Sequence, residues 1–171
     1  MSTLRWFDRK LTFGYPVEML PFFLERLDGT AARIEHKVST LDDTLLSSRL
    51  DDKWSVKQHI GHLAEVDQVA NKRIQEMVRG VSPMSPAVFE PSDYNAWPIE
   101  KLLEFFRVTR QKNLASYGGL HEQDLKKSSL HPRLNVMMTP VDLAWFDAEH
   151  DDHHLVKINE IIVTLKKNSR P

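Results

Sequence analysis

The chain has 171 residues, with 23 Lys+Arg against 24 Asp+Glu and no cysteine. The near balance of charge argues against a general affinity for nucleic acid or an anionic membrane, and no uncharged apolar run approaches the ~18 residues of a membrane span. Without cysteine there is no disulfide, thiolate metal site or cysteine nucleophile, so any metal must use histidine, carboxylate and water. The charged N-terminus is unlike a signal peptide. We therefore expect one cytoplasmic domain spanning residues 1–171.

The first long helix is indicated by apolar residues that recur in alternating steps of four and three. This spacing is typical of a helix in a bundle. Residues 1–15 before it form a predicted N-terminal tail, whose aromatic side chains can pack over an opening. The apolar residues of the helix are Leu20, Leu24, Leu27, Ala31, Ile34, Val38 and Leu41.

The second long helix follows a polar connection at residues 42–53, which includes a possible helical turn at 43–48. Ser55 followed by Gln58 is a capping-box pattern, so we expect the helix to begin at Ser55. It should run to about Arg79 and stop at Gly80. Its apolar positions cover about half of the circumference, as expected for a bundle helix with two neighbours.

The third and fourth helices are each preceded by a long connection. Residues 81–98 carry four prolines and predict a crossover loop that covers one end of the site. Pro98 suits the first turn of helix three, which should end at residues 118–119. After an irregular stretch at 120–138, residues 139–142 (TPVD) read as N-cap, N1 proline and acidic N3, opening a helix to about Lys167. No strand-like alternation of useful length occurs, so the sequence predicts an all-α four-helix bundle.

Two histidines on the last helix suggest a metal site. His150 and His154 are four residues apart, so both imidazoles lie on one helical face. On a helical wheel they share the apolar stripe of Leu143, and we expect them to point inward. Two inward imidazoles on one turn are harder to satisfy with hydrogen bonds than one, which favours metal binding. On helix two, His59 lies near the middle of the apolar arc and His62 toward its edge, so periodicity slightly favours His59 as a third ligand.

Other residues near this pair allow more than one interpretation. Asp147, three residues before His150, could orient a ligand ring, bind the metal or simply be a solvated acid. His153 is predicted to support a ligand or to pack rather than to bind metal. Trp54 and Trp145 are predicted core residues.

Two other kinds of metal site do not fit the spacing. A di-iron bundle requires carboxylate-x-x-His on two helices, whereas both such pairs here lie on helix four. Residues 150–154 (HDDHH) resemble a variant zincin motif with Asp151 as base, but little chain remains after it to supply a third ligand.

Three segments together resemble the DinB/YfiT-like superfamily. They are WSVKQHIGHLAE at 54–65, HP at 131–132 and AEHDDHHLVK at 148–157. The resemblance implies an up-down-down-up four-helix bundle, often dimeric, with a three-histidine metal site. Carried over residue by residue, the ligands fall on His62, His150 and His154. Asn135 stands where many members have glycine, so the loop there is expected to differ in shape.

The resemblance also implies a class of function. Members include thiol S-transferases that use bacillithiol or mycothiol, a maleylpyruvate isomerase and proposed hydrolases. We expect a divalent ion, Zn²⁺ or Ni²⁺, because both suit neutral imidazoles. The predicted activity is S-transfer from a low-molecular-weight thiol to a small electrophile, by a homodimer. The alternatives are a metal-dependent hydrolase and a non-catalytic metal-binding or stress-response bundle; no catalytic residue is assigned.

Overall fold

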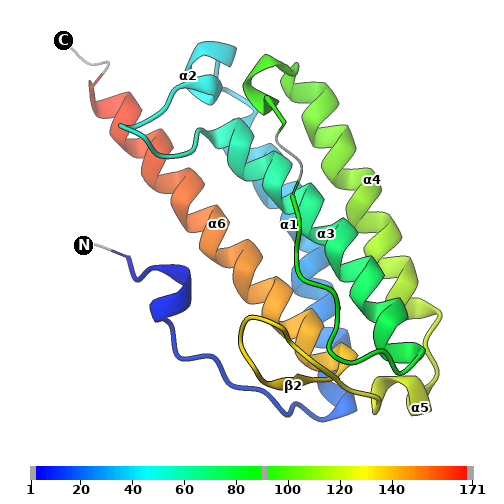
Figure 1. Ribbon diagram of the computed structural model, residues 1–171. Helices are drawn as coiled ribbons and strands as arrows, with labels where there is room; N and C mark the ends of the chain where they lie inside the picture. The colour runs from blue at the N-terminus through cyan, green and yellow to red at the C-terminus, as the bar shows by residue number, and fades with distance from the viewer. Residues whose placement is uncertain (1–2, 90–91, 169–171) are drawn as a thin grey trace.

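Four long helices form the body of the protein. The computed structural model describes residues 3–89 and 92–168. The chain runs up α1, down α3 and α4, and up α6 (Figure 1), which confirms the expected up-down-down-up bundle. No helix in these two ranges is long and apolar enough to cross a membrane. The long helices are α1 (Leu20–Val38), α3 (Val56–Val78), α4 (Ile99–Gly118) and α6 (Pro140–Asn168).

The remaining elements are short and lie at the ends of the bundle or beside it. A helical turn was expected at 43–48, and the structure confirms it as α2. Helix α5 interrupts the stretch that was predicted to be irregular. The short helical elements are α2 (Asp43–Ser47), α5 (Glu122–Leu125) and three 3₁₀ turns at Trp6–Asp8, Val17–Met19 and Tyr94–Ala96.

The predicted capping signals fix where the two site-bearing helices begin. Ser55 Oγ accepts a hydrogen bond from the Gln58 backbone N–H at 3.1 Å, and Gln58 Oε1 accepts from the Ser55 N–H at 3.0 Å. Thr139 and Asp142 make the equivalent reciprocal pair at the start of α6, at 3.2 and 3.0 Å. Each pair satisfies two backbone donors that a helix start leaves free. Pro98 is the N-cap of α4, one position before the predicted first turn.

The stretch before α6 contains a small sheet that was not predicted. Strands β1 (Ser129–Leu130) and β2 (Met137–Met138) pair antiparallel, with Ser129 opposite Met138. Two residues per strand are too few for alternation to register in the sequence. In the connecting loop, Asn135 adopts a left-handed conformation at φ 54°. Asparagine tolerates this region better than most residues, so Asn135 adopts a conformation that glycine favours.

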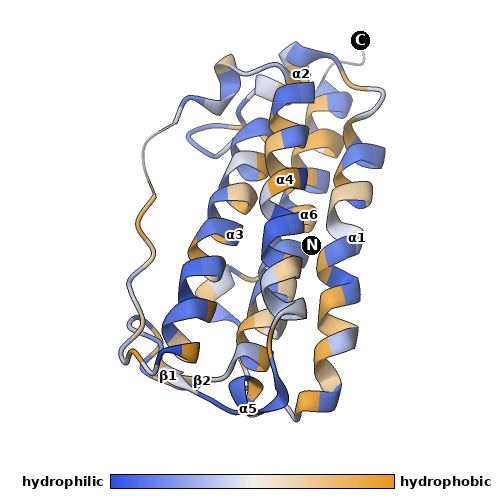
Figure 2. Ribbon diagram, turned by 90° about the vertical axis from the view of Figure 1, so that its right-hand side faces the viewer, coloured by the Kyte–Doolittle hydropathy of each residue, from blue (hydrophilic) through white to orange (hydrophobic). Residues whose placement is uncertain are grey.

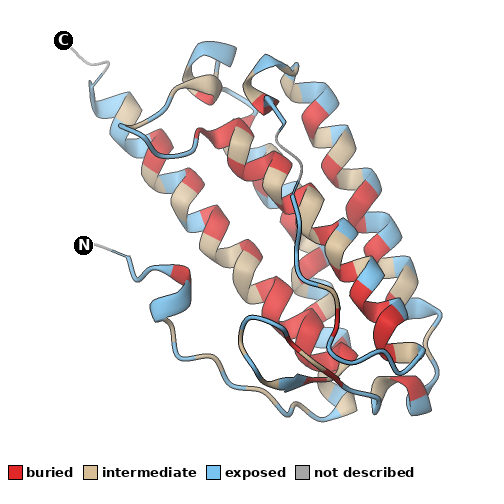
Figure 3. Cartoon of the chain, in the orientation of Figure 1, coloured by how far each residue is buried: buried red, intermediate tan, exposed pale blue. Residues whose placement is uncertain are grey.

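The bundle interior consists of two apolar clusters separated by a polar layer. Figure 2 shows hydrophobic and hydrophilic residues on different faces of each helix, and Figure 3 shows buried residues on the inner faces. One cluster includes Leu27 and Ala148, and the other includes Ile34 and Leu155. Along α1 and α6 the polar residues therefore stand between the two clusters. On these two helices they are Thr30 and Asp151. Asp67 on α3 and Arg110 on α4 complete the layer, and all four residues are buried.

Arg110 is the centre of this polar layer. Its Nε donates to Asp67 Oδ2 at 3.0 Å, and its two terminal nitrogens donate to the Asp151 carboxylate at 2.7 and 3.1 Å. The Arg110 Nη1 also reaches the Leu27 carbonyl oxygen at 2.9 Å, and Thr30 Oγ1 donates to Asp151 at 2.7 Å. The two carboxylates raise the pKa of Arg110 above its usual range, against the effect of burial. One guanidinium thus links all four long helices.

The N-terminal tail lies alongside α6 (Figure 1). Asp142 Oδ1 accepts hydrogen bonds from the backbone N–H groups of Gly14 and Tyr15, at 2.6 and 3.0 Å. Arg9 forms an ion pair with Glu149. Trp6 is buried, 5.1 Å from the ring of Phe146. These contacts bring the aromatic tail against the helix that carries the predicted ligands.

Candidate metal centre

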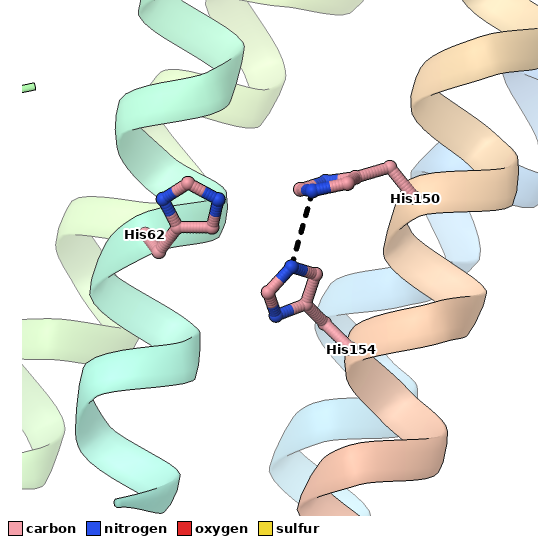
Figure 4. A group of neighbouring side chains, drawn as sticks. All are labelled: His62, His150 and His154. Carbon is pink, nitrogen blue, oxygen red and sulfur yellow. Dashed lines mark hydrogen bonds between the residues drawn. The ribbon is translucent and has the colours of Figure 1, made fainter. Parts of the chain in front are cut away.

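Three histidines from two helices face one another near the middle of the bundle. Figure 4 shows His62 on α3 opposite His150 and His154 on α6. One nitrogen from each ring lies within 4.8 Å of the others, and the Nε2 atoms of His150 and His154 are 3.1 Å apart. Tetrahedral zinc with bonds of 2.0–2.1 Å holds its nitrogens about 3.3 Å apart. The arrangement is therefore close to what one ion requires.

The three rings are in the protonation state that binds metal. Burial lowers the pKa of His62 to about 4 and the pKa values of His150 and His154 well below their usual range. Each imidazole is therefore neutral at pH 7. A neutral ring offers a lone pair, whereas a protonated ring does not.

His59 lies behind the cluster rather than in it. Its Nδ1 is 2.7 Å from His154 Nδ1. When His154 donates this hydrogen bond, the lone pair of its other nitrogen, Nε2, is left free on the side of His150. Periodicity slightly favoured His59, whereas in the structure it is His62 that groups with His150 and His154. The buried His59 ring is used to orient His154.

Glu65 and Tyr94 extend the site on the side of His62, and sequence reasoning missed both. Glu65 Oε2 is 3.8 Å from His62 Nδ1, and Tyr94 Oη donates to Glu65 Oε1 at 2.8 Å. A Cβ at position 61 would lie 2.3 Å from the Tyr94 ring, so Gly61 lets that ring pack against α3. The signal for Glu65 was its place three residues after His62, on the same helical face.

Asp147 is buried, so its interpretation as a solvated acid is wrong. Its Oδ2 and the Nδ1 of His150 are both enclosed, and neither has a hydrogen-bond partner within residues 3–89 and 92–168. Asp147 therefore does not orient His150 directly. Burial raises the pKa of Asp147 well above its usual range.

The other predicted residues lie around the cluster. His153 packs beside Trp6, with ring centroids 5.8 Å apart. Trp145 is buried as predicted, but Trp54 is 42% exposed, so its assignment to the core is wrong. Trp54 precedes α3 and sets its ring 4.9 Å from that of His62. It is an aromatic wall beside the histidines.

A cavity of about 500 Å³ adjoins His62 and His150. The N-terminal tail and the 81–98 connection each supply part of its wall, as predicted for segments that cover the site. Most of the wall is apolar, whereas four of its side chains besides the two histidines are charged or polar. The apolar lining is Trp6, Phe7, Val66, Val69, Ala70, Pro86, Ala87, Phe89, Pro132 and Phe146, and the polar lining is Arg73, His131, Arg133 and Asp147.

The metal-free protein is expected to lose stability as the pH falls from 7 to 5. His59, His62, His150 and His154 have lowered pKa values because of burial, so each takes up a proton on unfolding in this range. Two buried acids with raised pKa values, Asp67 at about 7 and Asp147, oppose them by releasing protons. Burial also lowers the pKa of His131 to about 4 and that of His153, and raises that of Glu65, so the net uptake is roughly two to three protons, or about 3–4 kcal/mol per pH unit.

Urea unfolding followed by circular dichroism at pH 5, 6, 7 and 8 measures this slope. The free energy of unfolding should be highest near pH 7 and fall toward pH 5 as the unfolded histidines take up protons, while the raised pKa values of Asp67 and Asp147 make it fall again toward pH 8. A free energy that is constant over this range would contradict the burial of the four rings in neutral form.

Comparison with known proteins gives one family and several structural relatives. The family model of the DinB superfamily matches residues 26–158. OB0413 of Oceanobacillus iheyensis, provisionally named a metal-dependent hydrolase, is 23% identical over 165 residues, covering 90% of this chain and 89% of that protein. YfiT from Bacillus subtilis, described as a probable metal-dependent hydrolase with an unusual four-helix bundle topology, superimposes with a TM-score of 0.80 at 19% identity, covering 92% and 94% of the two chains.

A mycothiol-dependent maleylpyruvate isomerase is a more distant structural neighbour. It superimposes with a TM-score of 0.66 at 12% identity and covers 95% of this chain and 70% of its own. At these identities the structural likenesses establish the fold.

Proposed function

This chain belongs to the DinB superfamily, and from that premise we propose that it is an enzyme whose divalent ion is held by His62, His150 and His154. The observation that carries the proposal is the convergence of three neutral imidazoles from two helices beside a cavity. Zn²⁺ and Ni²⁺ suit this set of ligands. Three protein ligands are typical of catalytic sites, which keep a position open.

The favoured reaction is transfer of a low-molecular-weight thiol to a small electrophile. An ion in this site supplies positive charge that stabilises a thiolate at neutral pH. The chain has no cysteine, so the sulfur nucleophile must come from a cosubstrate. The apolar wall beside His62 and His150 would hold the electrophile and exclude water from it. The fold shared with a mycothiol-dependent isomerase supports a thiol cosubstrate.

Hydrolysis is the second candidate, and it is favoured by what is said of OB0413 and YfiT. The same three ligands would suit activation of water. A third possibility is a non-catalytic bundle that binds metal. The homodimer and the cytoplasmic location stay predictions.

We expect metal-loaded protein to conjugate thiols such as N-acetylcysteine or 2-mercaptoethanol to 1-chloro-2,4-dinitrobenzene. A C–S bond forms, chloride leaves and the thiol proton passes to solvent. The rate should exceed that of metal-free protein at least ten-fold and be lost in His150→Ala, because the ion stabilises the attacking thiolate. The conjugation rate is measured by the absorbance of the thioether product.

His36→Ala is the matched control, since His36 is exposed on α1 and should leave the rate unchanged. Ester or amide hydrolysis without thiol, lost in His150→Ala, would instead favour the hydrolase. If the ion is bound and neither thiol conjugation nor hydrolysis is observed, the non-catalytic bundle is favoured.

A further inference from the structure

Arg73 is a buried cation in the wall of the cavity. It lies on α3 and is 6% exposed. Within residues 3–89 and 92–168, no carboxylate comes within 4.0 Å of its guanidinium nitrogens, and its hydrogen bond there is from Nε to the Ser85 carbonyl oxygen at 3.3 Å. A buried charge is costly unless it is paired. Arg73 is therefore suited to bind an anion.

Two nearby acids, Glu76 and Asp147, act on Arg73 only through space, and neither forms a hydrogen bond to it within the two described ranges. Glu76, three residues further along α3, accepts hydrogen bonds from both the backbone N–H and the hydroxyl of Ser85. Asp147 lines the same cavity, and burial raises its pKa well above its usual range, which favours its protonated form. A neutral carboxyl does not repel an incoming anion, and its proton can be donated to one.

Two further donors border the same space. His131 Nδ1 accepts from the backbone N–H groups of Leu134 and Arg133, at 3.1 and 3.3 Å. The proton of this neutral ring is therefore on Nε2, which is a donor. The guanidinium of Arg133 lies over the Phe7 ring, 3.5 Å from its centroid. Apart from the candidate ligands His62 and His150, the polar lining of the cavity thus consists of two cations, a neutral donor and one acid whose pKa is raised by burial.

We propose that the cavity binds a small apolar molecule through its carboxylate, with Arg73 as the partner of that carboxylate. The inference rests on the proposed function in that this molecule would be the substrate acted on at the histidines. His62 and Arg73 are eleven residues apart on α3, or about 16 Å along the helix axis. The carboxylate is therefore held away from the histidines, and the apolar wall between them contacts the body of the substrate.

The test uses metal-free protein, so that a carboxylate cannot bind to an ion. Isothermal titration calorimetry compares 5-phenylpentanoate with 5-phenylpentanamide, which differ only in the charged end. The acid should bind at least ten-fold more tightly than the amide, and Arg73→Gln should abolish this preference while Arg73→Lys retains part of it. Arg79→Gln is the matched control: Arg79 is an exposed arginine next to the C-terminus of α3 and should leave the preference unchanged.

Equal affinity for acid and amide in the wild-type protein, or the same preference in Arg73→Gln, would overturn the proposal. If Arg73→Gln does not fold, the ¹⁵N resonance of Arg73 Nε in the wild-type protein decides: it should shift with the acid and not with the amide, and a resonance that is unmoved by the acid would reject the site. A carboxylate on the thiol would use the same chemistry, so 3-mercaptopropionate is titrated in parallel. Binding of that thiol alone, and not of 5-phenylpentanoate, would overturn the assignment to the substrate.

Metal content is measured separately on each variant by mass spectrometry. If the Arg73→Gln variant keeps its ion but loses the preference for the acid over the amide, the carboxylate site is supported. Failure of the wild-type protein to bind any ion would reject the proposed enzyme, while the result with the acid would still stand.

Discussion

Replacing His154 by alanine is expected to reduce bound metal from one ion per chain to a small fraction of that amount. His154 Nε2 lies 3.1 Å from His150 Nε2, and both are within 4.8 Å of a nitrogen of His62. Removing one of three ligands should cost roughly 100-fold or more in affinity, given the total binding energies of protein zinc sites. Mass spectrometry of protein purified without an affinity tag measures the metal, and His150→Ala should behave in the same way.

His59 and His62 provide a graded comparison. His62→Ala removes a proposed ligand and should also lose the metal. His59→Ala removes only the hydrogen-bond partner of His154, so it should weaken binding about 10–100-fold. Replacing the exposed His36 by alanine should leave the metal affinity unchanged. Loss of metal in His59→Ala together with full occupancy in His62→Ala would reverse the assignment, and full occupancy in both helix-six variants would reject the site.

Replacing Arg110 by methionine should destabilise the protein by roughly 3–5 kcal/mol. The guanidinium is the shared partner of Asp67 and Asp151, and the side chains of all three are at most 3% exposed. Without it, one or both carboxyls would remain buried with no compensating charge. Urea unfolding at pH 7 measures the loss.

Two comparison variants show whether the stability loss in Arg110→Met comes from leaving carboxylates buried without a partner or only from losing a contact. Arg107→Met removes a partly exposed ion pair from the same helix and should cost about 1 kcal/mol or less. A triple variant, with leucine at Asp67 and Asp151 as well, should recover much of the stability lost in Arg110→Met. If Arg110→Met costs no more than Arg107→Met, the polar layer is not what joins the four helices.

The long helices could be predicted because their signals are local. Ser55 and Gln58 lie three residues apart, as do Thr139 and Asp142, and each pair fixes a helix start without reference to the rest of the fold. Gly80 marks the end of α3 because its φ of +75° is unfavourable for other residues. The two-residue strands carried no comparable signal.

The candidate site was less predictable because it depends on how helices face one another. Periodicity gives the angle of a side chain around its helix axis. It does not show which residues of the opposite helix lie at the same level along that axis. His59 and His62 were therefore hard to separate, and only the resemblance chose His62. Arg110 and Asp151 are 41 residues apart, so nothing local indicated their pairing. Trp54 was placed in the core because tryptophan is usually buried, whereas here it borders the site.

The walls of the cavity have a different structural origin from its histidines. The histidines stand on α3 and α6, whose positions are fixed by packing along their length. Trp6, Phe7, Pro86 and Phe89 stand on the N-terminal tail and the 81–98 connection, outside the four long helices. Such segments tolerate insertion and substitution far better than packed helices do. Gene duplication followed by drift in these two segments would therefore change which molecules are recognised while the histidines stay in place, so one bundle could give rise to enzymes with unrelated substrates.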